Sequence, residues 1–295
     1  MAEVPSEDGG STVPRRQLGR HLRQLREEAG ITVRAAVQAM EWSGQKLWRI
    51  EKGLGPVRAM DAKNLCELYG ADQRTTEALM ALAKETKAKG WWHAYGKTLP
   101  AWFELYVGLE AAASRIRAYD ADVISGLLQT KRYAEAVHRL HPATDEERGR
   151  FIDVRVQRQA LLTRRVPPPP KIEMILGEVA LLRVPDRSVM REQLDRLIEV
   201  SKLSNITLRV LPIKAGLHPG LDCGNRFAIL EFPKSRNGQQ EPPVIYSDFL
   251  TGAWYGDAPD EVAAYDEVWG EMEAASLSPE DSLQLITSLR RRGRR

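Results

Sequence analysis

The stretch from Ile31 to Gly53 constrains this chain more than any other segment, because its spacing predicts two short helices joined by a tight turn. Gly30 is placed to end a preceding helix over residues 17–29. Thr32 and Ser43 each stand directly before an apolar-periodic run, as N-cap residues do. The sequence therefore predicts three consecutive helices with short connections.

The third of these helices, expected over residues 44–52, has two different faces. Leu47 and Ile50 are its inward positions, which leaves a polar side outward. A helix fits the major groove of DNA, where Arg pairs with guanine and Gln with adenine through two hydrogen bonds. We expect base contacts from Gln45 and Arg49, and a phosphate contact from Lys46. The alternative is an ordinary solvated helix face, because exposed Gln, Lys and Arg are common. The full predicted DNA-binding set is Thr32, Arg34, Ser43, Gly44, Gln45, Lys46 and Arg49.

Further periodic residues complete an expected helical bundle. Helices over residues 61–69 and 75–87 would close it, with Cys66 as a core thiol. The inward positions of the first two helices are predicted to be Leu18, Leu22, Leu25, Ala29, Val33, Ala36, Val37 and Met40.

Charge supports a nucleic-acid partner only through its distribution. The formal net charge of the 295-residue chain is +3, which by itself suggests no such partner. Residues 11–60, however, hold ten basic and four acidic side chains. Residues 241–289 hold eleven acidic side chains and no Lys or Arg. We expect the first segment to face phosphate and the second to avoid it.

Several runs together resemble a known family. LGRHLRQLREEAG, WS and KLWRIEKG are similar to the Xre-type helix-turn-helix regulators, which include the lambdoid phage repressors. ELYGADQ, RIRAYDADVISGLLQTKRYAEAV, RQALLTR, GEVALLR, REQLDRLIEVS, ITLRVLP, GLHPG, FAILEF, VIYSD and LSPEDSLQLI resemble the long actinobacterial branch of that family, whose members carry an antitoxin-like C-terminal domain. The resemblance covers nearly the whole chain after its first dozen residues.

The resemblance implies roles for individual residues. Arg26 and Glu51 match a pair that forms an ion pair between the first helix and the end of the third. Gly44, Gln45 and Arg49 match base-contacting positions. The implied partner is a double-stranded DNA operator.

The chain also departs from the family pattern. Gly44 offers no side chain at a base-contacting position, and Trp48 replaces a residue that is usually small. Val37 stands where the family commonly has Ala, and Glu41 stands where it commonly has Gly. A left-handed backbone at Glu41 would cost roughly 1 kcal/mol or more. We therefore expect a helix-turn-helix with some strain in its turn.

The expected fold class is α+β multidomain: an all-α, five-helix, lambda-repressor-like domain followed by a larger helical and mixed α/β domain. The predicted boundaries are a disordered leader over 1–13, the helix-turn-helix domain over 14–88, an aromatic-rich connecting segment over 89–110, an antitoxin-like regulatory domain over 111–290 and a basic tail over 291–295. The connecting segment concentrates Trp91, Trp92, Tyr95, Trp102, Phe103 and Tyr106. These rings would serve a packed hinge or, alternatively, a dimer contact or ligand-lining wall.

The C-terminal half shows both helical and strand patterns. Strands are expected over residues 172–176, 206–211, 227–232 and 244–246. Helices are expected over residues 119–140, 145–164, 186–201 and 261–275, and a last helix begins at Ser278 and Pro279.

Catalysis has one candidate pair, Cys223 and His218, since a nearby imidazole could generate a thiolate. A glycine-rich turn before a strand explains the same residues without chemistry, and no third orienting residue is identifiable. No phosphate-binding glycine loop or zinc-like His/Cys cluster is present, so we expect no catalytic residues, no metal and no cofactor. No apolar run approaches a membrane span, and the cysteine usage suggests a reducing cytoplasm.

Three classes of function follow from these patterns. The favoured one is a sequence-specific transcriptional regulator, acting as a homodimer, whose C-terminal domain responds to a ligand or partner protein. The resemblance implies an alternative, an antitoxin-like protein that neutralises a small protein encoded by a neighbouring gene and autoregulates its operon. The third class is an enzyme with a DNA-binding appendage. The expected location is the cytoplasm, and the nucleoid when the protein is bound to DNA.

Overall fold

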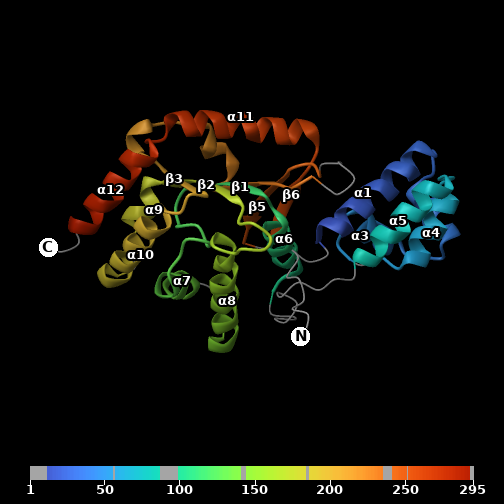
Figure 1. Cartoon of the computed structure of the whole chain (residues 1–295), viewed down its shortest axis with the longest axis horizontal. Coiled ribbons are helices and arrows are strands. Elements are labelled where there is room, and N and C mark those ends of the chain that lie inside the picture. Colours follow the sequence, from blue (N-terminus) through green and yellow to red (C-terminus); the bar gives the residue numbers. More distant parts are fainter. Residues whose placement is uncertain are drawn as a thin grey trace. The chain divides into compact units, whose positions relative to one another are not determined.

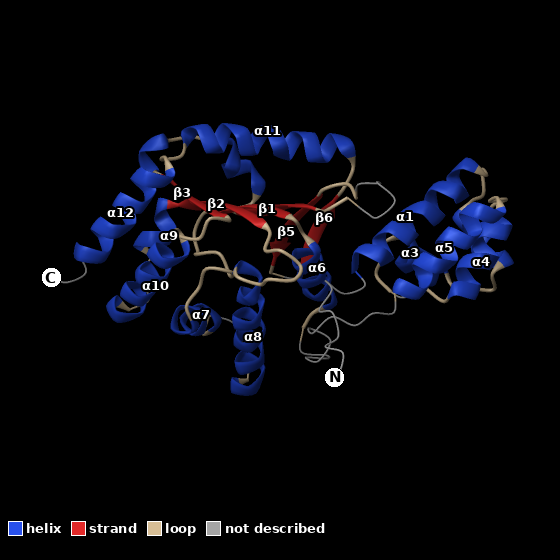
Figure 2. Cartoon of the chain, in the orientation of Figure 1, coloured by secondary structure: helices blue, strands red, loops and turns tan. Residues whose placement is uncertain are grey.

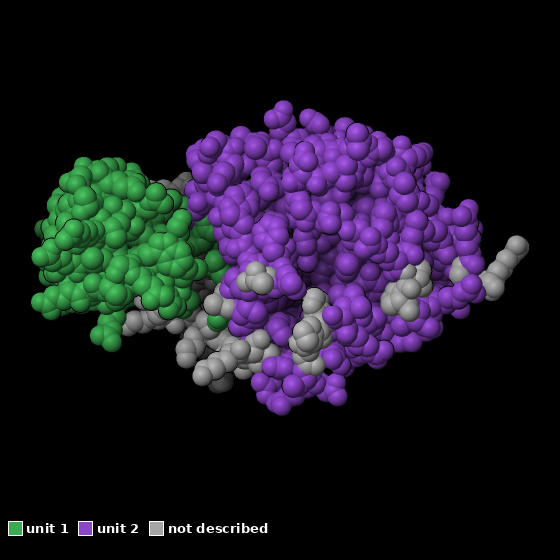
Figure 3. All heavy atoms as spheres, turned by 180° about the vertical axis from the view of Figure 1, so that it is seen from behind, with its two compact units in different colours: residues 1–94, 104–112 green, residues 95–103, 113–295 purple. Residues whose placement is uncertain are grey.

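The computed structural model describes residues 12–55, 57–86, 99–140, 144–183, 186–234, 241–250 and 252–292. The chain divides into two compact units, one of residues 1–94 and 104–112 and the other of residues 95–103 and 113–295 (Figure 3). The first is helical and the second is mixed α/β, so the predicted fold class is confirmed.

Five helices form most of the first unit. They are α1 (Thr12–Glu28), α2 (Val33–Ala39), α3 (Gly44–Glu51), α4 (Ala59–Leu68) and α5 (Gln73–Glu85). Because α1 begins at Thr12, the expected leader over 1–13 is too long at its C-terminal end, and residues 1–11 lie outside the described part.

The core of this unit is built from the inward stripes of all five helices. Leu18, Leu22, Leu47 and Leu65 are almost completely buried, and Cys66 is buried among them as expected. Two predicted core positions are wrong, because Val33 is 43% exposed and Ala29 is exposed in the turn after α1. The helix α2 is only two turns long, and its one fully buried residue is Ala36.

Gly19 allows α1 and α3 to cross closely. A Cβ atom added at Gly19 would lie 2.3 Å from the carbonyl oxygen of Ile50 and 2.9 Å from that of Glu51. These atoms belong to the backbone of α3, so they cannot move aside without moving the helix. A glycine at this position therefore sets the distance of α3 from α1.

The second unit is built around a six-stranded sheet. Its strands are β1 (Arg115–Asp120), β2 (Lys171–Gly177), β3 (Ile206–Leu211), β4 (Arg226–Glu231), β5 (Val244–Phe249) and β6 (Gly252–Gly256). Its α-helices are α7 (Lys131–His138), α8 (Asp145–Arg158), α9 (Glu178–Leu182), α10 (Arg187–Val200), α11 (Pro259–Ala275) and α12 (Pro279–Arg292). Short 3-10 turns cover Gln159–Leu162, Ile213–Ala215 and Pro219–Cys223. Helix α6 (Ala101–Ala112) spans the division between the units.

The strand order is β3-β2-β1-β4-β5-β6 (Figure 2). Strands β1, β2 and β3 are parallel, and the chain between them passes through helices, as parallel connections require. Strand β4 runs antiparallel beside β1, and β5 and β6 continue as antiparallel neighbours. The three parallel strands therefore end at one edge of the sheet, where β4 begins and β5 ends.

Helices cover both faces of this sheet. Figure 1 shows α11 along one face and α7, α8 and α10 on the other. Under α11 lies an aromatic cluster that includes Tyr119, Phe227 and Trp269, with the Phe227 and Trp269 rings 6.4 Å apart in an edge arrangement. At the end of the sheet, α12 packs against β3 and α10.

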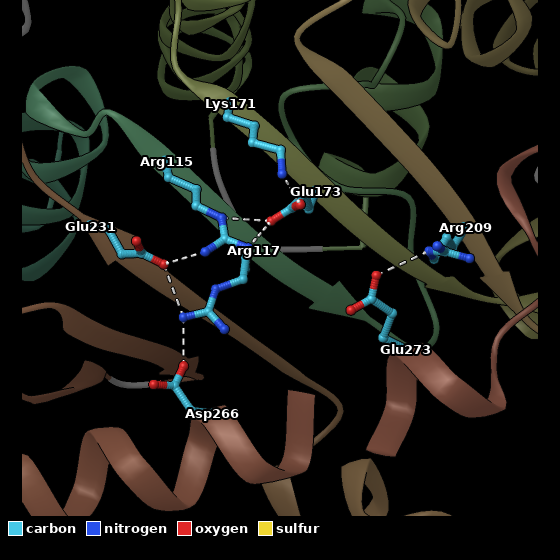
Figure 4. Close-up of polar contacts among 8 residues, drawn as sticks. All are labelled: Arg115, Arg117, Lys171, Glu173, Arg209, Glu231, Asp266 and Glu273. Carbon is cyan, nitrogen blue, oxygen red and sulfur yellow. Dashed lines mark hydrogen bonds and ion pairs between the residues drawn. The ribbon is translucent and has the colours of Figure 1, made fainter. Parts of the chain in front are cut away.

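Ion pairs connect the sheet to α11 (Figure 4). Arg115 contacts Glu173 at 2.6 Å and Glu231 at 3.1 Å. Arg117, whose side chain is 9% exposed, contacts Glu231 at 3.0 Å and Asp266 of α11 at 2.5 Å. Lys171 pairs with Glu173, and Arg209 with Glu273. A partly buried network of this kind fixes the position of α11 more than it stabilises the fold.

Several C-terminal predictions need correction. The helix expected over residues 119–140 is wrong, because Tyr119 lies in β1 and a helix begins only at Lys131. The charged residues Arg117 and Asp120 of β1 are buried, and the ion-pair partners of Arg117 come from distant segments that the local pattern does not reveal. The four expected strands are present as β2 to β5, whereas β1 and β6 were not predicted.

The predicted boundaries differ from the structure at two other places. The connecting segment over 89–110 contains most of α6, and its Trp91, Trp92 and Tyr95 lie outside the described residues. The basic tail over 291–295 is partly helical, because α12 continues to Arg292. No described helix is long and apolar enough to cross a membrane.

Replacing Gly19 by Ala should destabilise the first unit by about 1 to 3 kcal/mol, because the added Cβ forces α1 away from the backbone of α3. Gly44→Ala is the matched control, since nothing lies within 4 Å of a Cβ added there. Urea unfolding followed by far-UV circular dichroism measures both. Equal stability of the two variants would contradict the close crossing.

Candidate nucleic-acid interface

The helices α2 and α3 begin at capped ends. The Thr32 Oγ1 atom accepts a hydrogen bond from the Ala35 amide at 3.1 Å, and Ser43 Oγ accepts one from the Lys46 amide at 3.2 Å. Each cap satisfies one amide that the first turn of a helix would leave unpaired. Thr32 and Ser43, both in the predicted DNA-binding set, therefore have a structural role at the two helix starts.

The turn between α2 and α3 passes through a left-handed residue. Glu41 has φ = 53°, in the region that glycine adopts without steric cost. The Glu41 and Trp42 amides donate to the carbonyl oxygens of Gln38 and Val37 at 3.2 and 2.9 Å, which closes the turn. The strain expected from the sequence at this position is therefore present.

Arg26 and Glu51 form a two-pronged ion pair between α1 and the end of α3. The Nε atom of Arg26 lies 2.6 Å from Oε1 of Glu51, and Nη2 lies 3.0 Å from Oε2. Nη1 of Arg26 also donates to the carbonyl oxygen of Ile31 at 3.1 Å. Both acid and base side chains are 9% exposed. One guanidinium thus joins α1, the start of the α2 segment and the end of α3.

Burial and the Arg26–Glu51 ion pair shift the pKa values of Arg26 and Tyr69. The hydrogen bond to Glu51 raises the pKa of Arg26, although burial acts in the opposite direction. Burial raises the pKa of Tyr69 to about 12, and the nearby Glu51 carboxylate adds to that shift. The Arg26 guanidinium therefore stays charged over the physiological pH range.

The outward face of α3 is polar and exposed. Leu47 and Ile50 are buried, while Gly44, Gln45, Lys46 and Arg49 are exposed. The side chains of Gln45 and Arg49 have no hydrogen-bond or ion-pair partner among the described residues. Arg34 on α2 is exposed as well. The face consequently presents one amide and one guanidinium that an external acceptor can engage.

Lys46 differs from Gln45 and Arg49, because its ammonium group contacts other residues of the first unit. Its Nζ atom lies 3.5 Å above the centroid of the Trp42 ring and 3.7 Å from Oδ2 of Asp61. The Lys46 side chain is 45% exposed, so the contacts are weak ones at a solvated site. Sequence reasoning missed both partners of Lys46. Trp42 lies in the turn before α3, and Asp61 belongs to α4, so spacing along the chain does not reveal the second contact.

Comparison with protein families agrees with this geometry. Residues 17–79 match a family described as a helix-turn-helix domain, which supports a DNA-binding regulator. Residues 103–288, more than half of the chain, match a domain of unknown function (DUF5753). The chain belongs to the DUF5753 family. No curated protein and no solved structure matches it. In this DUF5753 protein the sheet unit is thus the family domain, and the helix-turn-helix precedes it.

The candidate pair for catalysis, Cys223 and His218, lies in the DUF5753 domain. The Cys223 Sγ atom lies 3.8 Å from the carbonyl oxygen of Pro219, and burial together with Asp222 raises the pKa of the thiol. Burial lowers the pKa of His218, whose Nδ1 atom has no hydrogen-bond partner among the described residues. Both shifts favour the neutral forms, which opposes formation of a thiolate. The described part of the chain also holds no group of three potential metal ligands.

Replacing Glu41 by Gly should stabilise the protein by roughly 0.5 to 1 kcal/mol, because glycine adopts the left-handed backbone without strain. Glu41→Ala serves as the control, since it removes the same charge and keeps the strain. Thermal unfolding of the two variants and the parent measures the difference. A gain of equal size with alanine would attribute the effect to charge.

Proposed function

We propose that this protein is a sequence-specific transcriptional regulator of the Xre type that reads the DNA major groove with α3. The observation that carries this proposal is the exposed pair Gln45 and Arg49 on a helix that is capped at Ser43 and fixed at Glu51. A rigid helix with free polar groups is what direct recognition of base edges requires.

The division of roles on α3 follows from its contacts. Arg49 can donate two parallel hydrogen bonds to a guanine, and Gln45 can pair with an adenine, each contributing about 1 to 3 kcal/mol of discrimination. Lys46 contacts phosphate after it leaves Asp61, so its contribution does not depend on base sequence. Two principal base-reading side chains specify few base pairs, and the protein accordingly acts as a homodimer on a repeated site.

The DUF5753 domain has a regulatory and dimerising role in this proposal, and the protein is not an enzyme. The raised pKa of Cys223 and the lowered pKa of His218 support this assignment, since neither group is prepared for nucleophilic chemistry. The site of action is DNA in the cytoplasm.

Replacing Arg49 by Ala should abolish the preference for one base pair in each half-site, with a loss of about 1 to 3 kcal/mol on the preferred sequence. The probe is a duplex that the full-length protein selects from random DNA, compared with the same duplex altered at single positions. Fluorescence anisotropy measures each affinity. Unchanged affinity and preference in Arg49→Ala would show that α3 does not read bases as proposed.

Two variants test the position of Lys46. Lys46→Ala should weaken binding to all duplexes and reduce the slope of log affinity against log salt by about 0.9. Asp61→Asn should have the opposite effect on affinity, because it frees the ammonium group that Asp61 now contacts at 3.7 Å. Loss of sequence preference in Lys46→Ala would instead place this residue on a base.

Trp48 is expected to contact thymine methyl groups. Its side chain is on the outward side of α3 with 52% exposure, and Gly44, one turn earlier, leaves open space. Replacing the contacted thymine by uracil in the selected duplex should weaken binding of the parent about fourfold, the effect of one methyl group of roughly 0.8 kcal/mol. Trp48→Ala should be insensitive to that replacement. Equal sensitivity of both proteins at every thymine would exclude the contact.

A further inference from the structure

We propose that a groove on the outward side of α10 binds a small molecule through its phosphate group, with Arg187 and Arg191 as the phosphate-binding residues. We call this surface the α10 groove. Its volume is about 530 Å³, which is typical of small-molecule sites. The inference rests on the proposed function only where it treats the ligand as an effector of the DUF5753 domain. The residues that line the groove are Thr130, Arg187, Ser188, Arg191, Glu192, Asp195, Arg196 and Glu199.

The groove follows one side of α10 and ends at the start of α7. All of its lining residues lie on α10 except Thr130, which is the N-cap of α7. The two helices pack against each other on one face of the sheet (Figure 1). Gln193, which is completely buried, fixes their contact. Its Oε1 atom accepts a hydrogen bond from the Thr130 amide at 2.7 Å, and its Nε2 atom donates to the Leu128 carbonyl oxygen at 2.8 Å. The wall of the groove is therefore preorganised.

The three carboxylates that line the groove are already engaged within the domain. Each of them pairs with an arginine, which comes from α7, from α12 or from α10 itself. The pairs are Glu192–Arg132 at 3.3 Å, Asp195–Arg290 at 2.7 Å and Glu199–Arg196 at 3.9 Å. The acidic side chains of the groove consequently need no external cation.

Arg187 and Arg191 are different, because they line the groove without an acidic partner. Both residues are exposed, and neither side chain has a hydrogen-bond or ion-pair partner among the described residues. They stand four residues apart, so their side chains lie on consecutive turns of the same helix face. Each guanidinium group can donate two parallel hydrogen bonds to a phosphate or carboxylate. Together they can surround one group that has several acceptor oxygens.

The place of this arginine pair is unfavourable for the helix itself. Helix α10 begins at Arg187, where a basic side chain meets the positive end of the helix dipole. Like charges at a spacing of four residues also repel each other. The Asp186 carboxylate is already used as a cap, because it accepts hydrogen bonds from the Ser188 and Val189 amides. Residues that local helix rules disfavour are expected at binding sites, where a ligand supplies the missing charge.

The balance of charge in the groove favours a doubly charged anion. The charged side chains that line it or contact its lining residues are Arg132, Arg187, Arg191, Arg196, Arg290, Asp186, Glu192, Asp195 and Glu199. The excess is one positive charge, and two when Lys131, the residue after Thr130, is included. A phosphate monoester carries a charge of about −1.5 to −2 at neutral pH, whereas a carboxylate carries a single charge. Phosphate therefore matches both the excess charge and the two free guanidinium groups.

The backbone of a nucleic acid presents the same phosphate chemistry but suits the groove poorly. After the two free arginines, α10 places Glu192, Asp195 and Glu199 along the groove. These carboxylates repel a chain of phosphates that follows the helix. A single phosphate group at the first turns of α10 avoids them, so we assign the groove to a small molecule.

The test is isothermal titration calorimetry of the full chain with inorganic phosphate, in slightly alkaline buffer at constant ionic strength. An Arg187→Ala, Arg191→Ala double variant should bind phosphate at least about tenfold more weakly than the parent. Arg139→Ala with Arg165→Ala is the matched control, because these arginines are exposed, their side chains have no partner among the described residues, and they lie outside the groove. The control should bind like the parent. No binding by the parent, or an equal loss in the control, would overturn the proposal.

Two further measurements check the ligand class and the folding of the variants. Acetate, a single-charge anion, should bind the parent at least about tenfold more weakly than phosphate, and equal affinity would overturn the assignment to phosphate. Phosphate should raise the thermal unfolding midpoint of the parent and the control but not that of the double variant. Without phosphate the double variant should be at least as stable as the parent, because the repulsion between the two arginines is gone.

DNA binding separates this inference from the proposed function. The probe is the duplex that the parent selects from random DNA, and without phosphate the double variant should bind it with the affinity and salt dependence of the parent. A salt slope reduced by about 0.9 for each arginine would instead place them on the DNA backbone and overturn the proposal.

The effector role has its own readout. Phosphate, compared with chloride at equal ionic strength, should change the affinity of the parent for the duplex and leave that of the double variant unchanged. An equal effect on both would overturn the effector role. Phosphate binding that depends on Arg187 and Arg191, in a protein that selects no DNA sequence, would support the groove and refute the DNA-binding proposal.

Discussion

The contact between Arg26 and Glu51 is the interaction on which the candidate DNA interface depends. Its two short hydrogen bonds fix the end of α3 to α1, and the third bond to Ile31 fixes the start of the α2 segment. Because both side chains are nearly buried, loss of either would leave the other as an uncompensated charge. With its last turn held in this way and its first turn capped by Ser43, α3 has one outward face, and Gln45 and Arg49 lie on it.

In the DUF5753 domain the corresponding constraint is the parallel arrangement of β1, β2 and β3. Parallel strands must return through long connections, and these place α7, α8 and α10 on one face of the sheet, whereas α11, which follows β6, covers the other face. The ion pairs of Arg117 with Glu231 and Asp266 then hold α11 on one of those faces. The described helices therefore cover both faces of the sheet.

The sequence predicted the first unit well because its determinants are local. The N-caps Thr32 and Ser43, the left-handed Glu41 and the buried Leu47 all act within a few residues of their place in the chain. Strand β1 could not be predicted in this way, since Arg115 and Arg117 are accommodated by carboxylates more than 50 residues away. The contact of Lys46 with Asp61 is likewise tertiary, and sequence spacing gives no indication of it.

In the proposed function the two units contribute to DNA recognition in different ways. A face on which Gln45 and Arg49 are the main free polar groups gives modest discrimination, because two base contacts contribute only a few kcal/mol. A dimer would present two copies of α3 to one DNA site. The number of base pairs recognised would then increase without any change in α3, provided that a separate surface sets the distance between the two copies. The concentration of positive charge in residues 11–60 and its absence from residues 241–289 are consistent with this separation of roles.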